Sequence, residues 1–244
     1  MTCPILMYHF IGDPEDPADS PYFVSSEKFD EQMKRLKKRG FKSISLGHLF
    51  NHLYRDEALP DKSVVITFDD GHLSFYEKAM PVLEKYDLTA TNFIITERAG
   101  KKNFMTWEQI NRAKLKGFSI ESHSVTHRVL TKINRSEVVN EALVSKKTIE
   151  KKLNSDVRFF CYRGGHYNEE IKSIVESCGY DASVCSRYGV NNSSTDRYEL
   201  KRVPIRGTDD LGIFLAKIHG YDWQRLHGRL FAKYLEPLKI HSLK

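Results

Sequence analysis

Two adjacent carboxylates at the end of an apolar segment are the first residues in this sequence that could do chemistry. Asp69 and Asp70 directly follow the apolar run at residues 64–68. Burial of two carboxylates side by side raises the pKa of one of them unless a cation lies close by. An Asp-Asp-Gly turn with an exposed helix cap is the structural alternative. The pair therefore predicts a functional site only where other residues support it.

Two histidines give this support. His123 and His127 stand four positions apart, directly after the apolar run at residues 118–121. If this segment turns helically, both imidazoles point the same way and can reach one metal ion. Histidines at this spacing also occur on surface helices. Combined with one carboxylate of the Asp pair, they predict a His-His-Asp metal site with the other carboxylate free to act as a base.

Two further segments have weaker chemical signals. His9 ends the first apolar run, and a single histidine in such a place is more often structural than catalytic. Another apolar run leads into Arg163, Gly164 and Gly165, followed by Tyr167. This segment is either a tight strand-to-helix turn or a functional turn. In the functional case, Gly164, Gly165 and Tyr167 bind the substrate or its developing oxyanion, with backbone N–H groups as donors, and Arg163 is a fixed cation near the carboxylates.

These motifs resemble those of the polysaccharide deacetylases related to nodulation-type chitooligosaccharide deacetylase, which form carbohydrate esterase family four. Residues 67–71 match the first family motif and residues 122–127 the second. The similarity extends from residue 4 to about residue 205, and the motif order is similar to that of the poly-N-acetylglucosamine deacetylases. The turn at residues 162–165 departs from the Pro-Tyr-Gly turn of the family. Candidates for the fourth motif are Asp181, Asp196 and Arg202.

The resemblance implies a role for each residue of the site. Asp69 would be the catalytic base, and His9 would be the catalytic acid. One divalent metal ion would be bound by three side chains, those of Asp70, His123 and His127. Zinc is the expected metal, with cobalt, nickel and iron as alternatives.

The implied reaction is metal-dependent hydrolysis of an N-acetyl group on an amino sugar. The expected partner is an N-acetylated saccharide in a polysaccharide, an oligosaccharide or a lipid-linked precursor, with phosphate-bearing forms included. Hydrolysis of another acyl amide, such as a formyl group on a lipid-linked sugar, is one alternative. A catalytically silent carbohydrate-binding protein is another. The complete set of base, ligands and acid favours an enzyme, since a binding module needs no group to activate water.

Short runs rich in β-branched and aromatic residues must position these side chains. They lie at residues 5–10, 41–44, 64–68, 91–95, 118–121, 157–162, 182–185 and 202–205. Stretches with helical spacing lie between several of them. Ser136 and Asn168 are the expected helix starts, and Gly40 and Gly179 the expected ends. This alternation predicts an α/β fold, either an open sheet or a (β/α) barrel. The resemblance favours a distorted or incomplete barrel of about seven parallel strands.

Composition excludes several classes of protein. Hydrophobic residues make up 40% of the 244 residues and charged residues 29%, which excludes a disordered chain. A net charge of +6 does not predict nucleic-acid binding, because the basic residues are scattered over helical faces. The four cysteines form no C-x-x-C pair, so we expect reduced thiols.

The sequence also leads to expectations about organisation and location. No apolar run approaches the roughly 20 residues of a membrane-spanning helix. The opening residues lack the pattern of a secretory signal, so we expect a cytoplasmic protein, with a peripheral position at the membrane as an option. One catalytic domain is expected over residues 1–244, with residues 222–244 as a terminal helical appendage. The oligomeric state stays open.

Overall fold

Ten strands are present in the structure, a computed structural model that describes residues 3–14 and 21–219. They are β1 (Ile5–Tyr8), β2 (Phe10–Ile11), β3 (Phe23–Val24), β4 (Lys42–Ser43), β5 (Ser63–Phe68), β6 (Thr91–Ile94), β7 (Ser119–Ser122), β8 (Phe159–Cys161), β9 (Ala182–Tyr188) and β10 (Leu200–Pro204). Each of the eight predicted runs overlaps one of them.

Seven of these strands close into a parallel barrel. Its order is β1, β10, β9, β8, β7, β6 and β5, and β5 pairs again with β1. In this closing pair, Ile5 lies opposite Val65 and Tyr8 opposite Phe68. β4 pairs with β5 as an additional strand, while β2 and β3 form a separate two-stranded ladder. The predicted (β/α) barrel with about seven parallel strands is confirmed.

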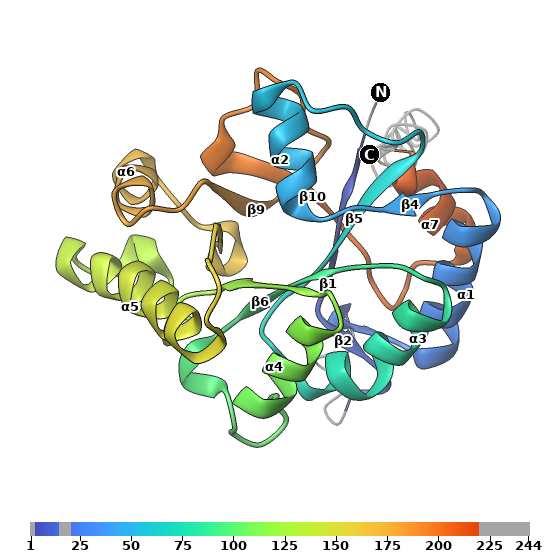
Figure 1. The fold of residues 1–244 in the computed structure, drawn as a ribbon, viewed down its shortest axis with the longest axis horizontal. Coiled ribbons are helices and arrows are strands. Elements are labelled where there is room, and N and C mark those ends of the chain that lie inside the picture. Colours follow the sequence, from blue (N-terminus) through green and yellow to red (C-terminus); the bar gives the residue numbers. More distant parts are fainter. Residues whose placement is uncertain (1–2, 15–20, 220–244) are drawn as a thin grey trace, which may run out of the picture.

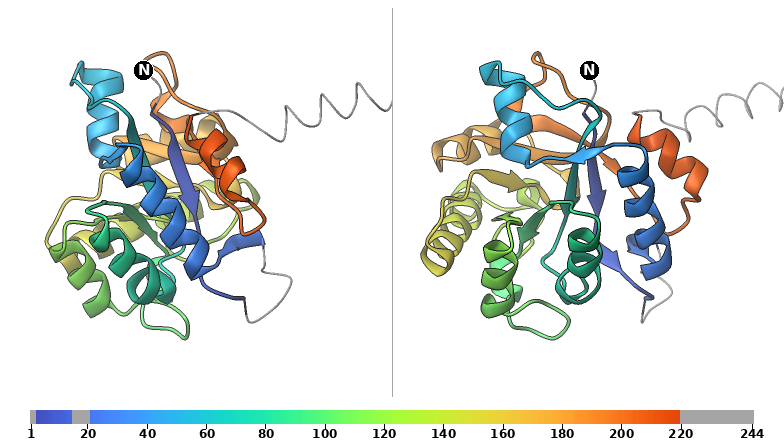
Figure 2. Two further views of the ribbon diagram at one scale, coloured as in Figure 1. Left: turned by 90° about the vertical axis from the view of Figure 1, so that its right-hand side faces the viewer. Right: turned by 45° about the vertical axis from the view of Figure 1, so that its right-hand side comes forward.

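Helices surround this barrel (Figure 1). They are α1 (Ser26–Lys38), α2 (Leu46–Arg55), α3 (Met80–Lys85), α4 (Trp107–Leu115), α5 (Arg135–Leu153), α6 (Glu169–Ser177) and α7 (Leu211–Ile218). Figure 2 shows α7 beside α1, so the last described helix packs near the first. No helix in the described ranges is long and apolar enough to cross a membrane. The predicted appendage at residues 222–244 lies outside the described residues.

The helix ends agree only in part with the sequence analysis. Asn168 caps α6 by accepting a hydrogen bond from a backbone N–H, as predicted. The prediction of Ser136 as the start of α5 is wrong, because Asn134 caps this helix in a capping box with Glu137. Gly40 and Gly179 follow the last turns of their helices with left-handed φ values of 77° and 81°.

Alternation along β5 divides the core into two parts. Val65 belongs to the inner apolar cluster, while Ile66 and Phe68 belong to the outer cluster beneath the helices. α2 closes the barrel at the amino ends of the strands, where its Phe50 ring lies 5.9 Å from the ring of Phe159. The interior at this end is therefore filled by side chains, which leaves the carboxyl ends of the strands to form a site.

Lys172 on α6 holds this helix against the turn that precedes β10. Its side chain is 9% exposed, and its Nζ lies 2.7 Å from Asp196 and 2.8 Å from both Glu169 and Glu199. Lys172 lowers the pKa of Glu199. Burial raises the pKa of Asp196, but Lys172 and the backbone N–H of Tyr198 together lower it overall. This cluster therefore stabilises the turn at residues 196–199, which leads into β10.

We expect Lys172→Met to lower the free energy of unfolding by about 2 kcal/mol at pH 7. Carboxyls with lowered pKa values contribute stability above their unfolded-state pKa, and this contribution is lost as the pH falls. The difference in the free energy of unfolding between wild type and Lys172→Met should therefore become smaller below about pH 4. Urea denaturation at pH 7 and pH 3 measures this difference, with Lys147→Met on the exposed face of α5 as the control. An equal loss at both pH values would contradict the ionic explanation.

Candidate active site

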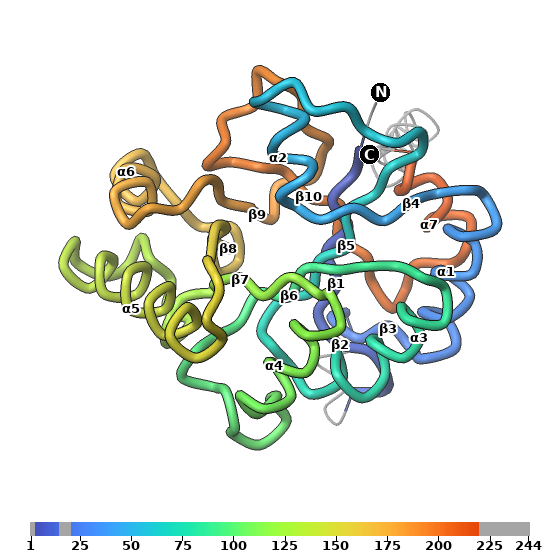
Figure 3. Tube along the Cα trace, in the orientation of Figure 1, coloured from blue at the N-terminus to red at the C-terminus, as the bar shows by residue number. Residues whose placement is uncertain are grey.

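The carboxyl ends of the strands bring together the acidic and imidazole side chains predicted from the sequence. Asp69 and Asp70 follow β5, His123 follows β7 and His9 follows β1. Figure 3 shows β5, β6 and β7 side by side in the chain trace. Asp70 and Gly71 have left-handed φ values of 75° and 72°. Such a conformation is uncommon for a non-glycine residue, and here it turns the chain sharply at the site.

Asp70, His123 and His127 form a compact set of metal-ligand types. Oδ1 of Asp70 lies 3.5 Å from Nε2 of His123 and 3.4 Å from Nε2 of His127. One ligand atom from each residue lies within 4.8 Å of the others. A carboxylate and two imidazoles are the ligands of many catalytic zinc sites, which keep a further position for water. The donor set therefore fits a divalent metal ion.

The orientation of the two imidazoles also fits this role. Nδ1 of His123 lies 2.8 Å from the carbonyl oxygen of Cys161 and donates its proton there, which directs Nε2 toward Asp70. Burial, together with the neighbouring His123, lowers the pKa of His127 to about 3. A neutral imidazole is the form that binds a metal.

The histidine segment is a loop, so the imidazoles do not meet through the helical turn that their spacing would allow. Ser124 and His127 have left-handed φ values of 66° and 63°, and no helix includes them. Buried Glu141 on α5 accepts hydrogen bonds from the backbone N–H groups of Val125 and Thr126, each at 2.9 Å. Its other oxygen accepts from the Thr126 hydroxyl. This carboxylate fixes the loop, so the two imidazoles converge without helical geometry.

Asp69 is held by a guanidinium that the sequence analysis did not place here. Nη1 and Nη2 of Arg202 donate to the two carboxylate oxygens of Asp69 at 2.7 and 2.8 Å. Arg202 is fully buried, and its Nε donates to the carbonyl oxygen of Cys185. Although burial raises the pKa of a carboxyl, Arg202 holds the pKa of Asp69 well below its usual range. Asp69 is therefore ionised and fixed in orientation.

Arg202 was among three candidates for the fourth motif, and the other two lie elsewhere. Asp181 pairs with Arg158 at 2.6 Å, and Asp196 pairs with Lys172. Both are structural contacts outside the pocket. Of the three candidates, only Arg202 reaches the acidic pair.

His9 lies on the wall of the same pocket. Its Nε2 is 4.0 Å from Oδ2 of Asp69, and burial lowers its pKa. The ring of Tyr22 lies 5.1 Å from the imidazole, and this tyrosine is 50% exposed. His9 thus stands between the buried carboxylate and an exposed aromatic side chain.

The glycine turn is only partly placed as the sequence suggested. Arg163 and Gly164 line the pocket, but the guanidinium bound to the carboxylate belongs to Arg202. The backbone N–H of Gly165 donates to the carbonyl oxygen of Tyr162 at 3.0 Å, and a Cβ at Gly165 would lie 2.6 Å from the backbone nitrogen of Ser186. The assignment of Gly165 to an oxyanion site is therefore wrong, because this glycine permits close packing against β9.

Tyr167 also has a structural position. Its ring stacks on Tyr162 at 4.9 Å, and its hydroxyl contacts Arg187. It is absent from the residues that line the active-site pocket. The assignment of Tyr167 to substrate binding therefore has no support in this geometry, whereas His166 does line the pocket.

A second set of ligand types adjoins the first. Asp69, His123 and Cys161 also place ligand atoms within 4.8 Å of one another. However, Nη2 of Arg202 donates to Sγ of Cys161 at 3.2 Å and binds Asp69 at the same time. A fixed positive charge in the middle of this set opposes a metal ion. The set with Asp70 is therefore the better metal site.

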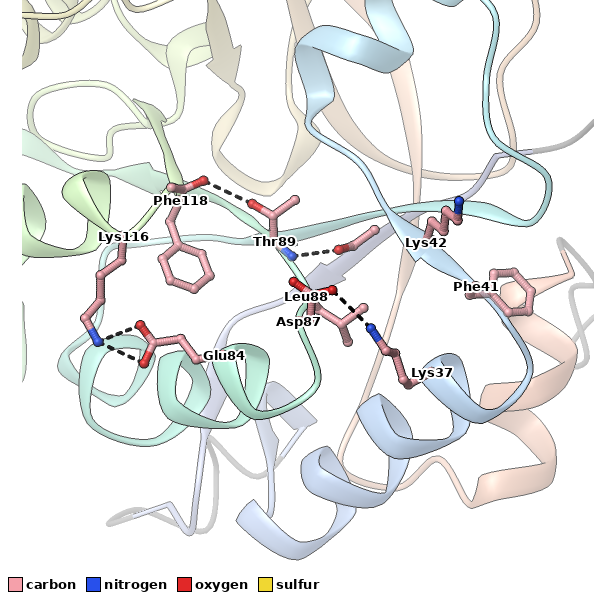
Figure 4. A pocket seen from close by; sticks show the side chains of 11 residues that line it. Lys37, Phe41, Lys42, Glu84, Asp87, Leu88, Thr89, Lys116 and Phe118 are labelled. Atoms are coloured by element: carbon pink, nitrogen blue, oxygen red, sulfur yellow. Dashed lines mark hydrogen bonds and ion pairs between the residues drawn. The ribbon is translucent and has the colours of Figure 1, made fainter.

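The site occupies a pocket of about 480 Å³ lined by the ligands, Asp69 and His9. Another pocket, of about 690 Å³, lies near the amino ends of β4, β6 and β7 (Figure 4). Two of its lysines are paired, Lys37 with Asp87 at 3.2 Å and Lys116 with Glu84 at 2.6 Å. This second pocket contains none of the metal-ligand set, so chemistry is assigned to the carboxyl ends of the strands.

Comparison with known proteins agrees with this site. The family model described as polysaccharide deacetylase matches residues 56–183. The chain is 33% identical over 202 residues to the Bacillus subtilis protein YxkH, covering 83% of this chain and 71% of the relative. It is 30% identical over 210 residues to poly-beta-1,6-N-acetyl-D-glucosamine N-deacetylase of Staphylococcus aureus, covering 80% of this chain and 71% of that enzyme.

A solved structure is similar over nearly the whole described chain. The Streptococcus pyogenes deacetylase PplD, solved in complex with acetate, superposes with a TM-score of 0.84 at 30% identity. The match covers 89% of this chain and 98% of that protein. With the family model and the curated relatives, these matches establish that the chain belongs to the polysaccharide deacetylase family.

Proposed function

We propose that this protein is a metal-dependent hydrolase that removes the N-acetyl group from an amino sugar of a polysaccharide. The observation that carries this proposal is the convergence of Asp70, His123 and His127 beside the buried carboxylate of Asp69. A fixed base next to three ligands is the arrangement that metal-assisted hydrolysis requires. The names of the Staphylococcus aureus enzyme and of PplD support acetyl removal.

Each side chain of the pocket has a role suited to its chemistry. A metal ion held by Asp70, His123 and His127 would polarise the acyl carbonyl and lower the pKa of bound water. Asp69 takes the proton of the attacking water, since Arg202 keeps this carboxylate ionised. His9 gives a proton to the leaving amine, since its imidazole lies on the wall of the same pocket with Nε2 4.0 Å from Oδ2 of Asp69. Gly164 lines the pocket, and we assign its backbone N–H to the developing oxyanion.

The acyl group is tested by comparing substrates. The purified protein is incubated with N-acetylglucosamine oligomers and with the matching N-formyl and N-propionyl oligomers, and free amines are quantified. We expect release from the N-acetyl series to exceed release from the others, because PplD is solved with acetate bound. Faster release of formate than of acetate would instead support the alternative acyl amide. Asp70→Asn, which removes a proposed metal ligand, is the control for contaminating activity.

Glu141→Ala tests whether the histidine loop must be fixed. The side-chain hydrogen bonds given for Glu141 are with Val125 and Thr126, and none of them involves a ring nitrogen of the metal ligands or the base. Loss of groups that orient metal ligands weakens metal binding by about 10- to 100-fold. We expect a loss of this size in zinc affinity, measured by competition with a fluorescent chelator. Unchanged zinc affinity in a folded Glu141→Ala variant would show that the loop needs no such support.

A further inference from the structure

A third cavity, separate from the pocket in Figure 4, lies next to the active-site pocket and has no role in the hydrolysis described above. Its volume is about 420 Å³, within the usual range for ligand pockets. Four rings from separate segments line it, those of Phe10, Phe23, His72 and Phe104. We refer to it as the aromatic pocket. Phe10 lines both this cavity and the active-site pocket, so the two lie next to each other.

The walls of the aromatic pocket are fixed in place. The centroid of Phe10 lies 4.9 Å from that of Phe23 and 4.6 Å from that of His72, and His72 lies 5.9 Å from Phe104. Ser74 holds the His72 ring, since its backbone N–H donates to Nδ1 at 3.1 Å. All four rings are partly exposed rather than buried. The pocket is therefore formed before a ligand arrives, which lowers the cost of binding.

The charges at its rim cancel. Asp13 and Glu77 carry negative charge, and Lys78 and Lys102 carry positive charge. A phosphate or a polyanion would need an excess of positive charge, which this rim does not have. Together with the exposed amide of Asn103, the rim offers hydrogen-bond donors and acceptors around apolar ring faces. This combination suits an uncharged ligand with apolar faces and many hydroxyls, which describes a pyranose ring.

The aromatic pocket lies close to the proposed metal site. Only Gly71 separates the metal ligand Asp70 from His72, so their Cα atoms lie within about 7 Å of each other. We propose that the aromatic pocket binds the sugar unit next to the one that is deacetylated, so that the protein prefers chains to single sugars. This inference rests on the proposed function for the identity of the neighbouring unit.

The test compares substrate length with the state of the pocket. The probes are N-acetylglucosamine and its linear oligomers of two to six units, in β-1,4 and β-1,6 linkage. For the wild type, kcat/KM should rise about tenfold or more from one unit to three, as expected for one added aromatic contact. Phe104→Ala and Phe23→Ala should each remove most of this rise. Phe104→Tyr, which keeps the ring, should restore it, and Val144→Ala on the exposed face of α5 should leave it unchanged.

Two results would overturn the inference. One is a wild-type kcat/KM that is independent of chain length, and the other is an equal loss for monomer and trimer in Phe104→Ala. If no probe is hydrolysed, calorimetric titration with the acetylated trimer separates the two proposals. Trimer binding that Phe104→Ala weakens about tenfold supports the aromatic pocket although the proposed function fails. If the trimer does not bind, or if Phe104→Ala does not change its affinity, the proposed role of the aromatic pocket in sugar binding is contradicted as well.

Discussion

Asp69→Asn is expected to lower kcat by about 1,000-fold while leaving one zinc ion bound per chain. The reason is that Asp69 is paired with Arg202 and lies outside the ligand set of Asp70, His123 and His127. Asparagine keeps the size of the side chain but cannot take a proton from water. Steady-state kinetics and zinc content of the purified variant measure both parts of this expectation.

His123→Ala is the comparison for this variant. It removes a ligand, so zinc and turnover should be lost together. Equal loss of zinc in Asp69→Asn and His123→Ala would contradict the separation of base from ligands. Because Asp69→Asn leaves Arg202 without its charged partner, the double variant Asp69→Asn/Arg202→Met serves as a second inactive form with both charges removed.

Arg202→Met is expected to have the largest effect on stability, a loss of about 3–5 kcal/mol. It leaves the buried carboxylate of Asp69 without a counter-charge, and Arg202 itself is 0% exposed. The double variant Asp69→Asn/Arg202→Met should be more stable than Arg202→Met alone, because no unpaired charge remains. Urea denaturation of the two single variants and the double variant measures this coupling. If Arg202→Met lowers the free energy of unfolding by less than about 1 kcal/mol, the stabilising role of the Asp69–Arg202 pair is contradicted.

The same variant should change the pH dependence of activity. In the wild type, Arg202 holds the pKa of Asp69 well below its usual range, so the base stays ionised throughout the acidic region. Without Arg202, burial raises this pKa, and kcat/KM should fall at higher pH values than in the wild type. The stability given by the ion pair is present above the unfolded-state pKa of about 3.9 and is lost as the pH falls below it. The stability difference between wild type and variant should therefore shrink in acid.

The sequence predicted the barrel well because its strands are short and strongly apolar. Each predicted run overlaps a strand, and the strand ends carry the acidic pair and the histidines where parallel strands place them. Helices α2 and α4, of 10 and 9 residues, were not predicted individually, although Leu46, Leu49, Phe50 and Leu53 give α2 an apolar face. Their packing is decided by the barrel that they cover.

The ion pair that holds Asp69 joins residues far apart in the sequence, so local sequence patterns could not predict it. Asp69 and Arg202 are 133 positions apart, and only closure of the barrel brings β10 to β5 across β1. Arg202 had a weak signal, as a lone arginine in an apolar strand. Glu141 had less, since a glutamate within α5 is typical of a solvated helix face. Arg163 was expected beside the carboxylates because of its place after β8, but the 3₁₀ turn Arg163–Gly165 leaves it exposed.

The central claim is that the Asp70–His123–His127 set makes this protein a metal-dependent N-deacetylase. The most direct test is acetate release from an N-acetylglucosamine oligomer by the purified protein as isolated, after chelation, and after addition of one equivalent of zinc. We predict that activity falls with the bound metal and returns with it, and that Asp70→Asn gains no activity from zinc. Acetate release that continues at full rate from metal-free protein would contradict the claim, as would a protein that binds oligomer but no metal.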